Sequence, residues 1–343
     1  MKKLLPALLL GLALPDVSDA GGFEAKTMRE PLSSREVERP ILLPKGWLEV
    51  GLHADMKQSN SEWGPDGDVI WYDGAADADG TSTTFLYTTE SLSIRYGVAQ
   101  RAELYWQLPF HYLKLTNPAL GTDTSGFYMG DPKFGWGFSL FRSDAPLTSV
   151  IARMELKVAA GNETPGSYIA GPSTYRAFIT STGTPDLRLA VEGKRQFGIF
   201  GVHGAAGYLY RFSGVAQYLL ETEFNQFNGR IKPGAQVYAN VGGQVQAGPV
   251  NLNGTFWFEN HGATRIGTTS AGLFPDNDLE AVAGSDGYSY GIDAGAVLNA
   301  TKGFDLVFNA NIPLRGEDLM FFPIEDLHPT RGITYTGGLE LRY

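Results

Sequence analysis

The chain ends in the sequence ITYTGGLELRY (Ile333–Tyr343), in which apolar and polar side chains alternate up to the last residue. Leu339 and Leu341 share one phase of this alternation, whereas Glu340 and Arg342 occupy the other. Successive side chains of a β-strand point to opposite faces, so the stretch predicts a strand with one apolar and one polar face.

The same period of two extends through almost all of the sequence after residue 45. In Ser149–Ala160, for example, Met154 and Leu156 alternate with Arg153 and Glu155. Twelve segments with this pattern are predicted to be strands: 46–57, 83–96, 101–113, 131–142, 148–160, 185–194, 200–212, 231–246, 249–260, 286–299, 303–315 and 332–343.

The connections between the predicted strands alternate in length. Long connections lie at 58–82, 114–130, 161–184, 213–230, 261–285 and 316–331, and short ones at 97–100, 143–147, 195–199, 247–248 and 300–302. Short turns at one end and long loops at the other are typical of an up-and-down meander. A soluble sandwich and a closed transmembrane barrel both accommodate such a meander.

The residues on the two faces favour the barrel. Aromatic residues such as Tyr96, Tyr112 and Tyr208 gather near the ends of the apolar phase, as in the interfacial girdles of outer-membrane barrels. A basic side chain that faces lipid near the bilayer midplane costs about 2 to 4 kcal/mol, so Arg153 and Lys157 must face the lumen. We therefore predict an all-β fold: a closed antiparallel up-and-down transmembrane β-barrel of about 12 strands.

Both ends of the sequence favour the bacterial outer membrane. Lys2 and Lys3 precede an apolar run that ends at Pro15, in the order of a cleavable signal peptide over residues 1–20. The last strand, which ends on Tyr343, resembles the assembly signal of bacterial outer-membrane barrels. The expected partners are outer-membrane lipid, the barrel-assembly machinery and a small-molecule solute.

The predicted organisation has three parts: the signal peptide (1–20), an N-terminal extension (21–45) and the barrel (46–343). The extension is polar and rich in both charge signs, so it forms either a periplasmic lead-in or a plug held in the lumen by charge pairing. The connection 213–230 has apolar residues at helical spacing, which allows a short loop helix. Glu90 falls on the outward phase of its strand, so either the strand bulges there or Glu90 lies above the hydrocarbon.

Composition excludes several functions. The absence of Cys excludes a disulfide framework, thiolate catalysis and Cys-based metal sites. A net charge of −10 is unfavourable for binding nucleic acid. No HExxH or P-loop pattern occurs, and the best remaining candidate for a metal or acid–base site is His261 beside Glu259 and Asn260. We predict no enzyme activity, no cofactor and no metal site.

Charged side chains of both signs occupy the inward phase. They either form ion-pair networks that stiffen a narrow barrel or build a constriction that filters solutes by size and charge. The candidate lumen-lining residues are Arg95, Arg101, Glu103, His111, Lys133, Arg153, Glu155, Lys157, Arg188, Glu192, Arg211, Arg315, Glu340 and Arg342. Those expected to pair across the lumen near the short-turn end are Arg101, Glu103, Arg153, Glu155, Arg188 and Glu192.

Several short motifs resemble the MetA-pathway-of-phenol-degradation family of outer-membrane barrels. They are Arg95-Tyr96-Gly97 before a short turn, Arg101, Glu103 and Leu108-Pro109 on the next strand, and Gly130-Asp131 at the start of the following one. The resemblance covers most of the chain after residue 20 and implies a channel or transporter for small, hydrophobic or aromatic, molecules. The alternative is a barrel without transport activity that is structural or binds a surface partner, for which the aromatic residues in 58–82 are candidates.

Overall fold

The computed structural model describes residues 42–63, 68–71, 84–117, 122–144, 147–160, 184–219, 226–268, 279–282, 285–301, 303–316 and 332–343. The chain divides into two compact units, Met1–Val37 and Glu38–Tyr343, and all described residues belong to the second. Within these ranges, no helix is long and apolar enough to cross a bilayer.

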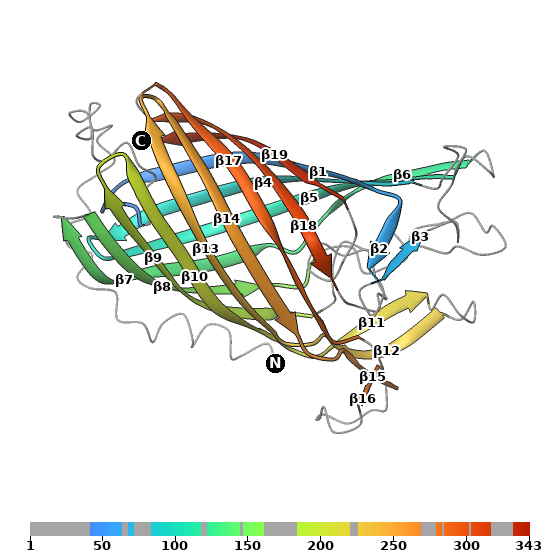
Figure 1. Cartoon of the computed structure of the whole chain (residues 1–343). Helices are drawn as coiled ribbons and strands as arrows, with labels where there is room; N and C mark the ends of the chain where they lie inside the picture. Colours follow the sequence, from blue (N-terminus) through green and yellow to red (C-terminus); the bar gives the residue numbers. More distant parts are fainter. Residues whose placement is uncertain are drawn as a thin grey trace. The chain divides into compact units, whose positions relative to one another are not determined.

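The second unit is a closed antiparallel β-barrel, as predicted (Figure 1). Its twelve strands are β1 (Leu48–Ser59), β4 (Thr84–Ala99), β5 (Ala102–Asn117), β7 (Lys133–Asp144), β8 (Leu147–Lys157), β9 (Asp186–Phe197), β10 (Phe200–Arg211), β13 (Gln236–Ala247), β14 (Val250–His261), β17 (Gly287–Thr301), β18 (Phe304–Gly316) and β19 (Thr334–Arg342). The pairing of β1 with both β19 and β4, together with that of β4 with β5, completes the ring.

Tight turns join the strands at one end of the barrel, where short connections were predicted. Gly198 and Gly248 begin two of these turns with φ angles of 62° and 61°. This left-handed conformation favours glycine, because a side chain there would clash with the backbone. The turn end also holds Tyr343, whose backbone N–H donates to the carbonyl of Leu48 at the start of β1.

Smaller strands lie beyond the ring. They are β2 (Ser61–Trp63), β3 (Val69–Trp71), β6 (Thr122–Met129), β11 (Gly214–Leu219), β12 (Gln226–Lys232), β15 (Arg265–Thr268) and β16 (Glu280–Ala281). β6 continues the main sheet beside β5, β2 pairs with β3, and β11, β12, β15 and β16 form a four-stranded sheet.

The expected loop helix within 213–230 is wrong, because β11 and β12 form a hairpin there. β15 also pairs with β12, so the segment gains the interstrand hydrogen bonds of a larger sheet. The predicted strand 231–246 also begins later, at Gln236. Pro233 cannot donate a backbone hydrogen bond, so the ladder is interrupted between β12 and β13.

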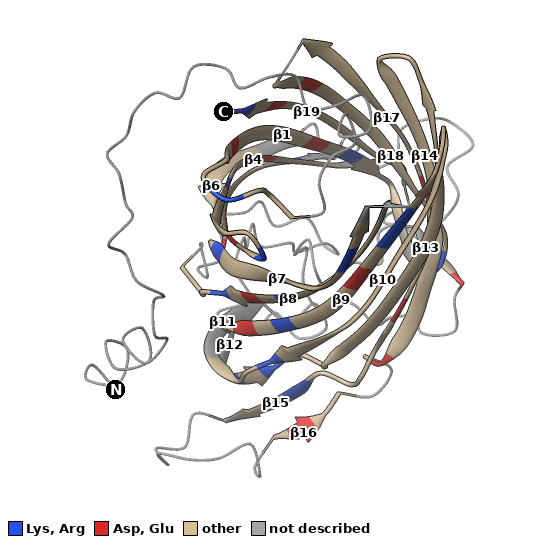
Figure 2. Cartoon of the chain, turned by 90° about the vertical axis from the view of Figure 1, so that its left-hand side faces the viewer, with Lys and Arg blue, Asp and Glu red and all other residues tan. Residues whose placement is uncertain are grey.

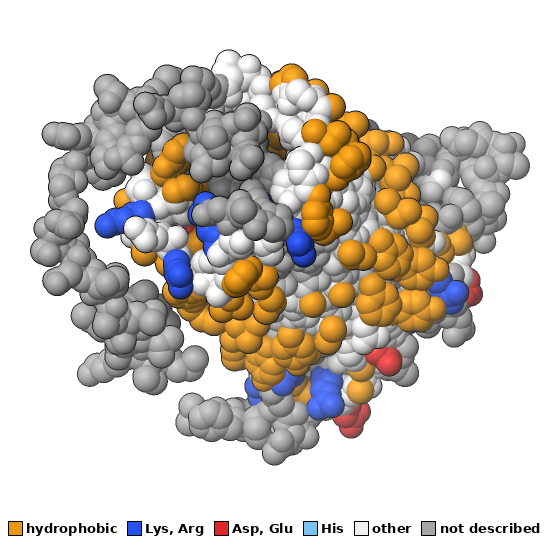
Figure 3. All heavy atoms as spheres, turned by 60° about the vertical axis from the view of Figure 1, so that its left-hand side comes forward, with side chains coloured by type: hydrophobic (Ala, Val, Ile, Leu, Met, Phe, Trp, Pro, Cys, Tyr) orange, Lys and Arg blue, Asp and Glu red, His pale blue; other side chains and the backbone are white. Residues whose placement is uncertain are grey.

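The outer face of the barrel is apolar. Leu339, Leu341 and Tyr343 are 44%, 38% and 71% exposed, and large apolar side chains of the outward phase are exposed on many strands. Figure 3 shows such side chains spread widely over one face of the molecule. An apolar exterior of this extent on a closed barrel fits lipid rather than water, which places the protein in the bacterial outer membrane.

Glu90 lies on this outer face. The pairing of β4 with β5 runs without a shift from Thr84 to Gly97, so the bulge considered at Glu90 is absent. Glu90 stands opposite Phe110 on β5 and Ala54 on β1, and its side chain is exposed. That Glu90 lies above the hydrocarbon stays a prediction.

Candidate functional site in the barrel lumen

A series of alternating charges begins on β18 at the turn end of the inner wall. Nη2 of Arg342 lies 2.5 Å from Oδ2 of Asp305, and Nε of the same arginine lies 2.8 Å from Oε2 of Glu49. The other oxygen of Glu49 lies 2.8 Å from Nη1 of Arg95. These contacts join β18, β19, β1 and β4, and therefore cross the pairing of the first and last barrel strands.

The series continues on the other side of β4. Nη2 of Arg95 lies 2.8 Å from Oε2 of Glu103, and Nη1 of Arg153 lies 2.6 Å from Oε1 of Glu103. Nε of Arg153 then lies 2.9 Å from Oε1 of Glu192 on β9. We call this series the ionic chain; its members are Asp305, Arg342, Glu49, Arg95, Glu103, Arg153 and Glu192. Figure 2 shows the charged positions on the strands of the ring.

Two glycines on β7 allow the ionic chain to cross that strand. Gly137 pairs with Glu103 on one side and with Arg153 on the other. A Cβ added at Gly137 would lie 3.3 Å from Cγ of Glu103, and one added at Gly135 would lie 2.2 Å from Cζ of Tyr105. Because β7 presents no side chain at these positions, groups on β5 and β8 can meet above it.

Glu103 is the most enclosed member of the ionic chain, with no exposed surface. A buried carboxylate is costly unless ion pairs and hydrogen bonds satisfy it. Here Arg95 and Arg153 supply the ion pairs, and the backbone N–H of Leu43 donates to Oε2 of Glu103 at 2.8 Å. Leu43 is itself completely buried, so the end of the N-terminal extension lies on the inner wall. Residues 21–41 lie outside the described residues, and the plug stays a prediction.

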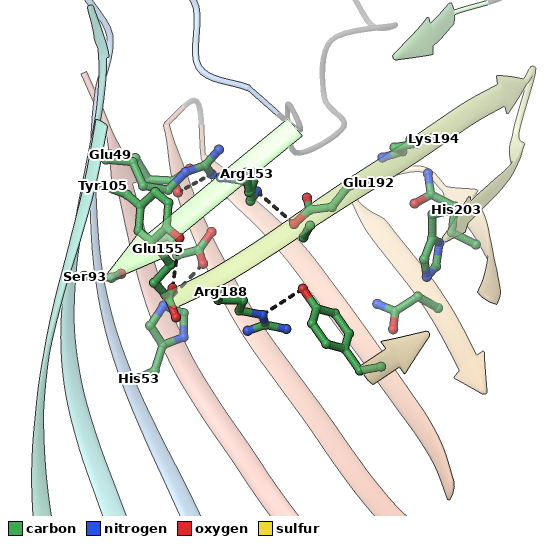
Figure 4. A pocket seen from close by; sticks show the side chains of 16 residues that line it. Glu49, His53, Ser93, Tyr105, Arg153, Glu155, Arg188, Glu192, Lys194 and His203 are labelled. Atoms are coloured by element: carbon green, nitrogen blue, oxygen red, sulfur yellow. Dashed lines mark hydrogen bonds and ion pairs between the residues drawn. The ribbon is translucent and has the colours of Figure 1, made fainter. Parts of the chain in front are cut away.

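A cavity of about 600 Å³ adjoins the ionic chain inside the barrel. Its lining is Glu49, His53, Ser93, Arg95, Tyr105, Arg153, Glu155, Arg188, Ala190, Glu192, Lys194, His203, Tyr238, Gln244, Asn253 and Glu340 (Figure 4). The cavity is therefore polar. Its lining residues come from nine strands, which make up most of the ring.

Two tyrosines inside the cavity hold charged neighbours. The hydroxyl of Tyr105 donates to Oε2 of Glu155 at 2.9 Å. Nε of Arg188 donates to the hydroxyl of Tyr238 at 2.7 Å, and the guanidinium carbon lies 4.2 Å from the centroid of the Tyr238 ring. Both tyrosines were missed as candidate residues. Their inward phase could have indicated them, but the partner of each lies two strands away along the wall and follows only from the strand register.

Most of the predicted lumen residues lie on the inner wall. Glu155, Arg188 and Glu340 line the cavity beside members of the ionic chain. His111 lies farther toward the loops, where Nδ1 is 2.8 Å from the Tyr87 hydroxyl and 3.0 Å from Oγ1 of Thr89.

A second buried charge cluster lies toward the loop end. Nζ of Lys157 lies 2.6 Å from Oδ2 of Asp186, and Lys133 pairs across the strands with Lys157. Arg211 is 2% exposed and donates to Oε1 of Gln236 at 3.3 Å. The predicted residues Lys133, Lys157 and Arg211 thus belong to the wall but not to the cavity.

The lumen prediction is wrong for Arg315 and stays a prediction for Arg101. Arg101 lies in the turn before β5 and is exposed, beyond the β4–β5 ladder, which shifts its register between Gly97 and Ala99 and ends at Ala102. Arg315 lies opposite Tyr290 after a second register shift, and its guanidinium carbon is 5.5 Å from the centroid of the Tyr288 ring. Tyr288 and Tyr290 stack with each other in the outward phase, so Arg315 belongs to the aromatic girdle.

His261, the candidate for a metal or acid–base site, is the last residue of β14. It lies at the loop end of β14, opposite Gln236 on β13 and Gly287 on β17. Within the part of the chain that the structure describes, no three His, Asp or Glu side chains are placed to hold a metal ion.

Comparisons with known proteins support the fold. No family model matches the sequence, and no curated protein matches it. The COG4313 outer membrane channel from Pseudomonas putida F1 superposes with a TM-score of 0.63 at 14% identity, covering 90% of this chain and 100% of that one. The autotransporter NalP translocator domain from Neisseria meningitidis (TM-score 0.44, 9% identity, 88% and 89% covered) and the TodX monoaromatic hydrocarbon channel (0.45, 8%, 88% and 90%) are also similar. The first of these shows that the fold is that of an outer-membrane barrel.

Proposed function

We propose that the protein is a passive outer-membrane channel that carries small molecules through its charged lumen. The observation that carries the proposal is the polar cavity of about 600 Å³ enclosed by a twelve-stranded barrel. Barrels of about 8 strands are filled by their side chains, whereas those of 16 to 18 leave a wide aqueous pore. Twelve strands leave space for a solute of limited size.

The ionic chain is the proposed constriction. Its charges are paired with one another, so a solute meets a wall that is polar but locally balanced, and size becomes the first filter. Tyr105 and Tyr238 add aromatic faces to the cavity, with Arg153 and Arg188 against their rings. These faces support the aromatic part of the solute class that the family resemblance implies.

The second candidate is a barrel closed to transport. The burial of Leu43 against Glu103 favours it, because the chain segment before β1 then occupies part of the inner wall at the turn end. The aromatic residues considered as a binding surface give less support. Of these, Trp63 lies against Gly316 at the rim of β18, and residues 72–83 lie outside the described residues.

Single-channel conductance of the purified protein in a planar bilayer separates the two candidates. Discrete conductance steps are expected for a channel, and small aromatic solutes should interrupt the current. A folded barrel that gives no steps, and that also fails to admit small neutral solutes into liposomes, would contradict transport and favour the second candidate.

A further inference from the structure

Asp293 is a carboxylate of the inner wall that does not belong to the ionic chain. It lies on β17 in the phase opposite to that of Ile292, which is exposed on the outer face. Its hydrogen-bond donors are two amides: Nδ2 of Asn311 donates to Oδ1 of Asp293 at 2.7 Å, and the side chain of Asn309 supplies a second bond. Among the described residues, no basic side chain forms an ion pair with Asp293.

The strands around Asp293 carry no lysine or arginine toward the lumen. Within β14, β17 and β18, as the structure describes them, Arg315 is the single Lys or Arg, and it belongs to the aromatic girdle. His203 of β10 approaches from the side, where its Nε2 lies 2.8 Å from Oγ1 of Thr255, the residue opposite Asp293 on β14. His203 lies on the side of the cavity away from Glu49 (Figure 4).

Two glycines leave space on either side of this carboxylate. Gly291 and Gly295 are the neighbours of Asp293 in the inward phase of β17. A Cβ added at Gly295 would lie 2.8 Å from Oδ1 of Asn253 on β14 and 2.8 Å from Oδ1 of Asn309 on β18. Both amide groups therefore extend over the glycine, one from each adjacent strand. Asn253 also lines the cavity of about 600 Å³, so this oxygen-rich patch borders the cavity.

Trp257 provides an aromatic surface on the other side of the carboxylate. It stands opposite Gly291, and a Cβ added at Gly291 would lie 2.5 Å from Cζ2 of the indole. The ring therefore lies over the backbone of β17 beside Asp293, and the side chain is partly exposed. Nε1 of Trp257 is buried and has no hydrogen-bond partner among the described residues, so the indole offers its face to the lumen.

We propose that Asp293 and Trp257 form a binding site in the lumen for small primary ammonium ions that carry an apolar group. The carboxylate and the amide oxygens of Asn253 and Asn309 accept the N–H groups of the ammonium. The apolar group lies on the indole, whose face attracts the positive charge. A single carboxylate without basic neighbours matches a single positive charge. This inference rests on the proposed channel function and names one class of solute.

Binding of benzylammonium to the folded protein in detergent micelles, measured by calorimetry with empty micelles as the blank, tests the site without requiring conduction. The titration is made at pH 8, at which histidine is ordinarily neutral, so His203 does not compete for Asp293. We expect saturable binding that weakens at least about tenfold in Asp293→Asn, because a charge-assisted hydrogen bond is lost. Trp257→Leu should weaken it about two- to fivefold. Benzyl alcohol, which has the ring without the charge, should bind more weakly than benzylammonium to the unaltered protein.

Asp55→Asn is the matched control. Asp55 is also an inward carboxylate, and it accepts a hydrogen bond from Oγ1 of Thr336. It lies on β1, which β19 and β18 separate from β17. Loss of a lumen charge outside the site should therefore leave benzylammonium binding nearly unchanged. If Asp293→Asn does not fold, Asp293→Ser removes the same charge with a smaller polar group and should show the same loss.

Three results would overturn the inference: no benzylammonium binding above that of empty micelles, equal binding by the unaltered protein and Asp293→Asn, or an equal loss in Asp55→Asn. Conductance measured in parallel tests the channel separately. Benzylammonium binding in a silent barrel would refute transport and leave the site standing, whereas conductance without Asp293-dependent binding would refute only the site.

Discussion

Arg153 and Glu103 lie on strands that do not pair with each other, yet Nη1 of the arginine is 2.6 Å from Oε1 of the glutamate. The strand between them, β7, contributes Gly137 at the crossing point. A single ion pair therefore links β5 directly to β8, whereas the backbone hydrogen bonds link them only through β7.

Gly137→Val should break this crossing. The added branches would displace the Glu103 side chain, and loss of one partner from a buried ion pair costs about 3 to 5 kcal/mol. We expect a fall of that order in the free energy of unfolding, measured by denaturant titration with tryptophan fluorescence. Gly337→Val is the control, because a Cβ added at Gly337 has no atom within 4 Å. Equal stability of the two variants would show that the crossing does not need the glycine.

Arg153→Ala should make the lumen more selective for cations. The variant removes one positive charge between Glu103 and Glu192 and leaves both carboxylates on the wall. A unit charge within a few ångströms of an ion in a wet pore changes its energy by about 0.5 to 1 kcal/mol, so the K⁺ to Cl⁻ permeability ratio should rise about two- to fivefold. The reversal potential in a KCl gradient measures this ratio. Arg195→Ala, on the outer face, should leave the permeability ratio unchanged. An unchanged ratio in Arg153→Ala would show that the ionic chain does not lie on the conduction path.

Leu43→Cys should be protected from a membrane-impermeant maleimide. The chain has no cysteine, so a single introduced thiol reports on one position. Leu43 is completely buried, whereas Lys45 is exposed, and we expect Leu43→Cys to react at least about tenfold more slowly than Lys45→Cys. Similar labelling rates at the two positions would mean that the segment before β1 leaves the inner wall in solution.

Glu90→Leu should stabilise the barrel in a bilayer. The exposed carboxylate of Glu90 lies between apolar outward residues, and acidic groups on the lipid face cost less than the 2 to 4 kcal/mol of basic ones. Because Glu90 is predicted to lie above the hydrocarbon, where a charged side chain costs about 0 to 1 kcal/mol, we expect a gain below about 1 kcal/mol in unfolding free energy in liposomes. Ser91→Leu, at a buried inward position on the same strand, should instead destabilise the protein. A loss of stability in Glu90→Leu would indicate that the carboxylate has a favourable partner at the membrane surface.

The alternation of apolar and polar residues was sufficient to predict the barrel, because a period of two defines both the strand and the face of each side chain. It failed where the period is interrupted. The register shift beside Gly291 turns Arg315 to the outer face, and the pairing of β12 with β15 makes strands of a segment with helical spacing. The meeting of Arg153 with Glu103 also lay beyond the sequence pattern, since it depends on which residues of three strands share a register.

The ionic chain also bears on how the barrel is assembled. Glu49 lies on the first barrel strand and Arg342 on the last, 293 residues later in the sequence. Until the final strand is in place, Glu49 lacks this arginine and Asp305 lacks the same neighbour. A nascent barrel that lacks its last strand therefore carries, at its open seam, carboxylates that still lack their ion pairs with Arg342. Docking of the last strand closes the backbone ring and brings Arg342 to both carboxylates in the same step. An incomplete barrel lacks these ion pairs and is therefore less stable in lipid.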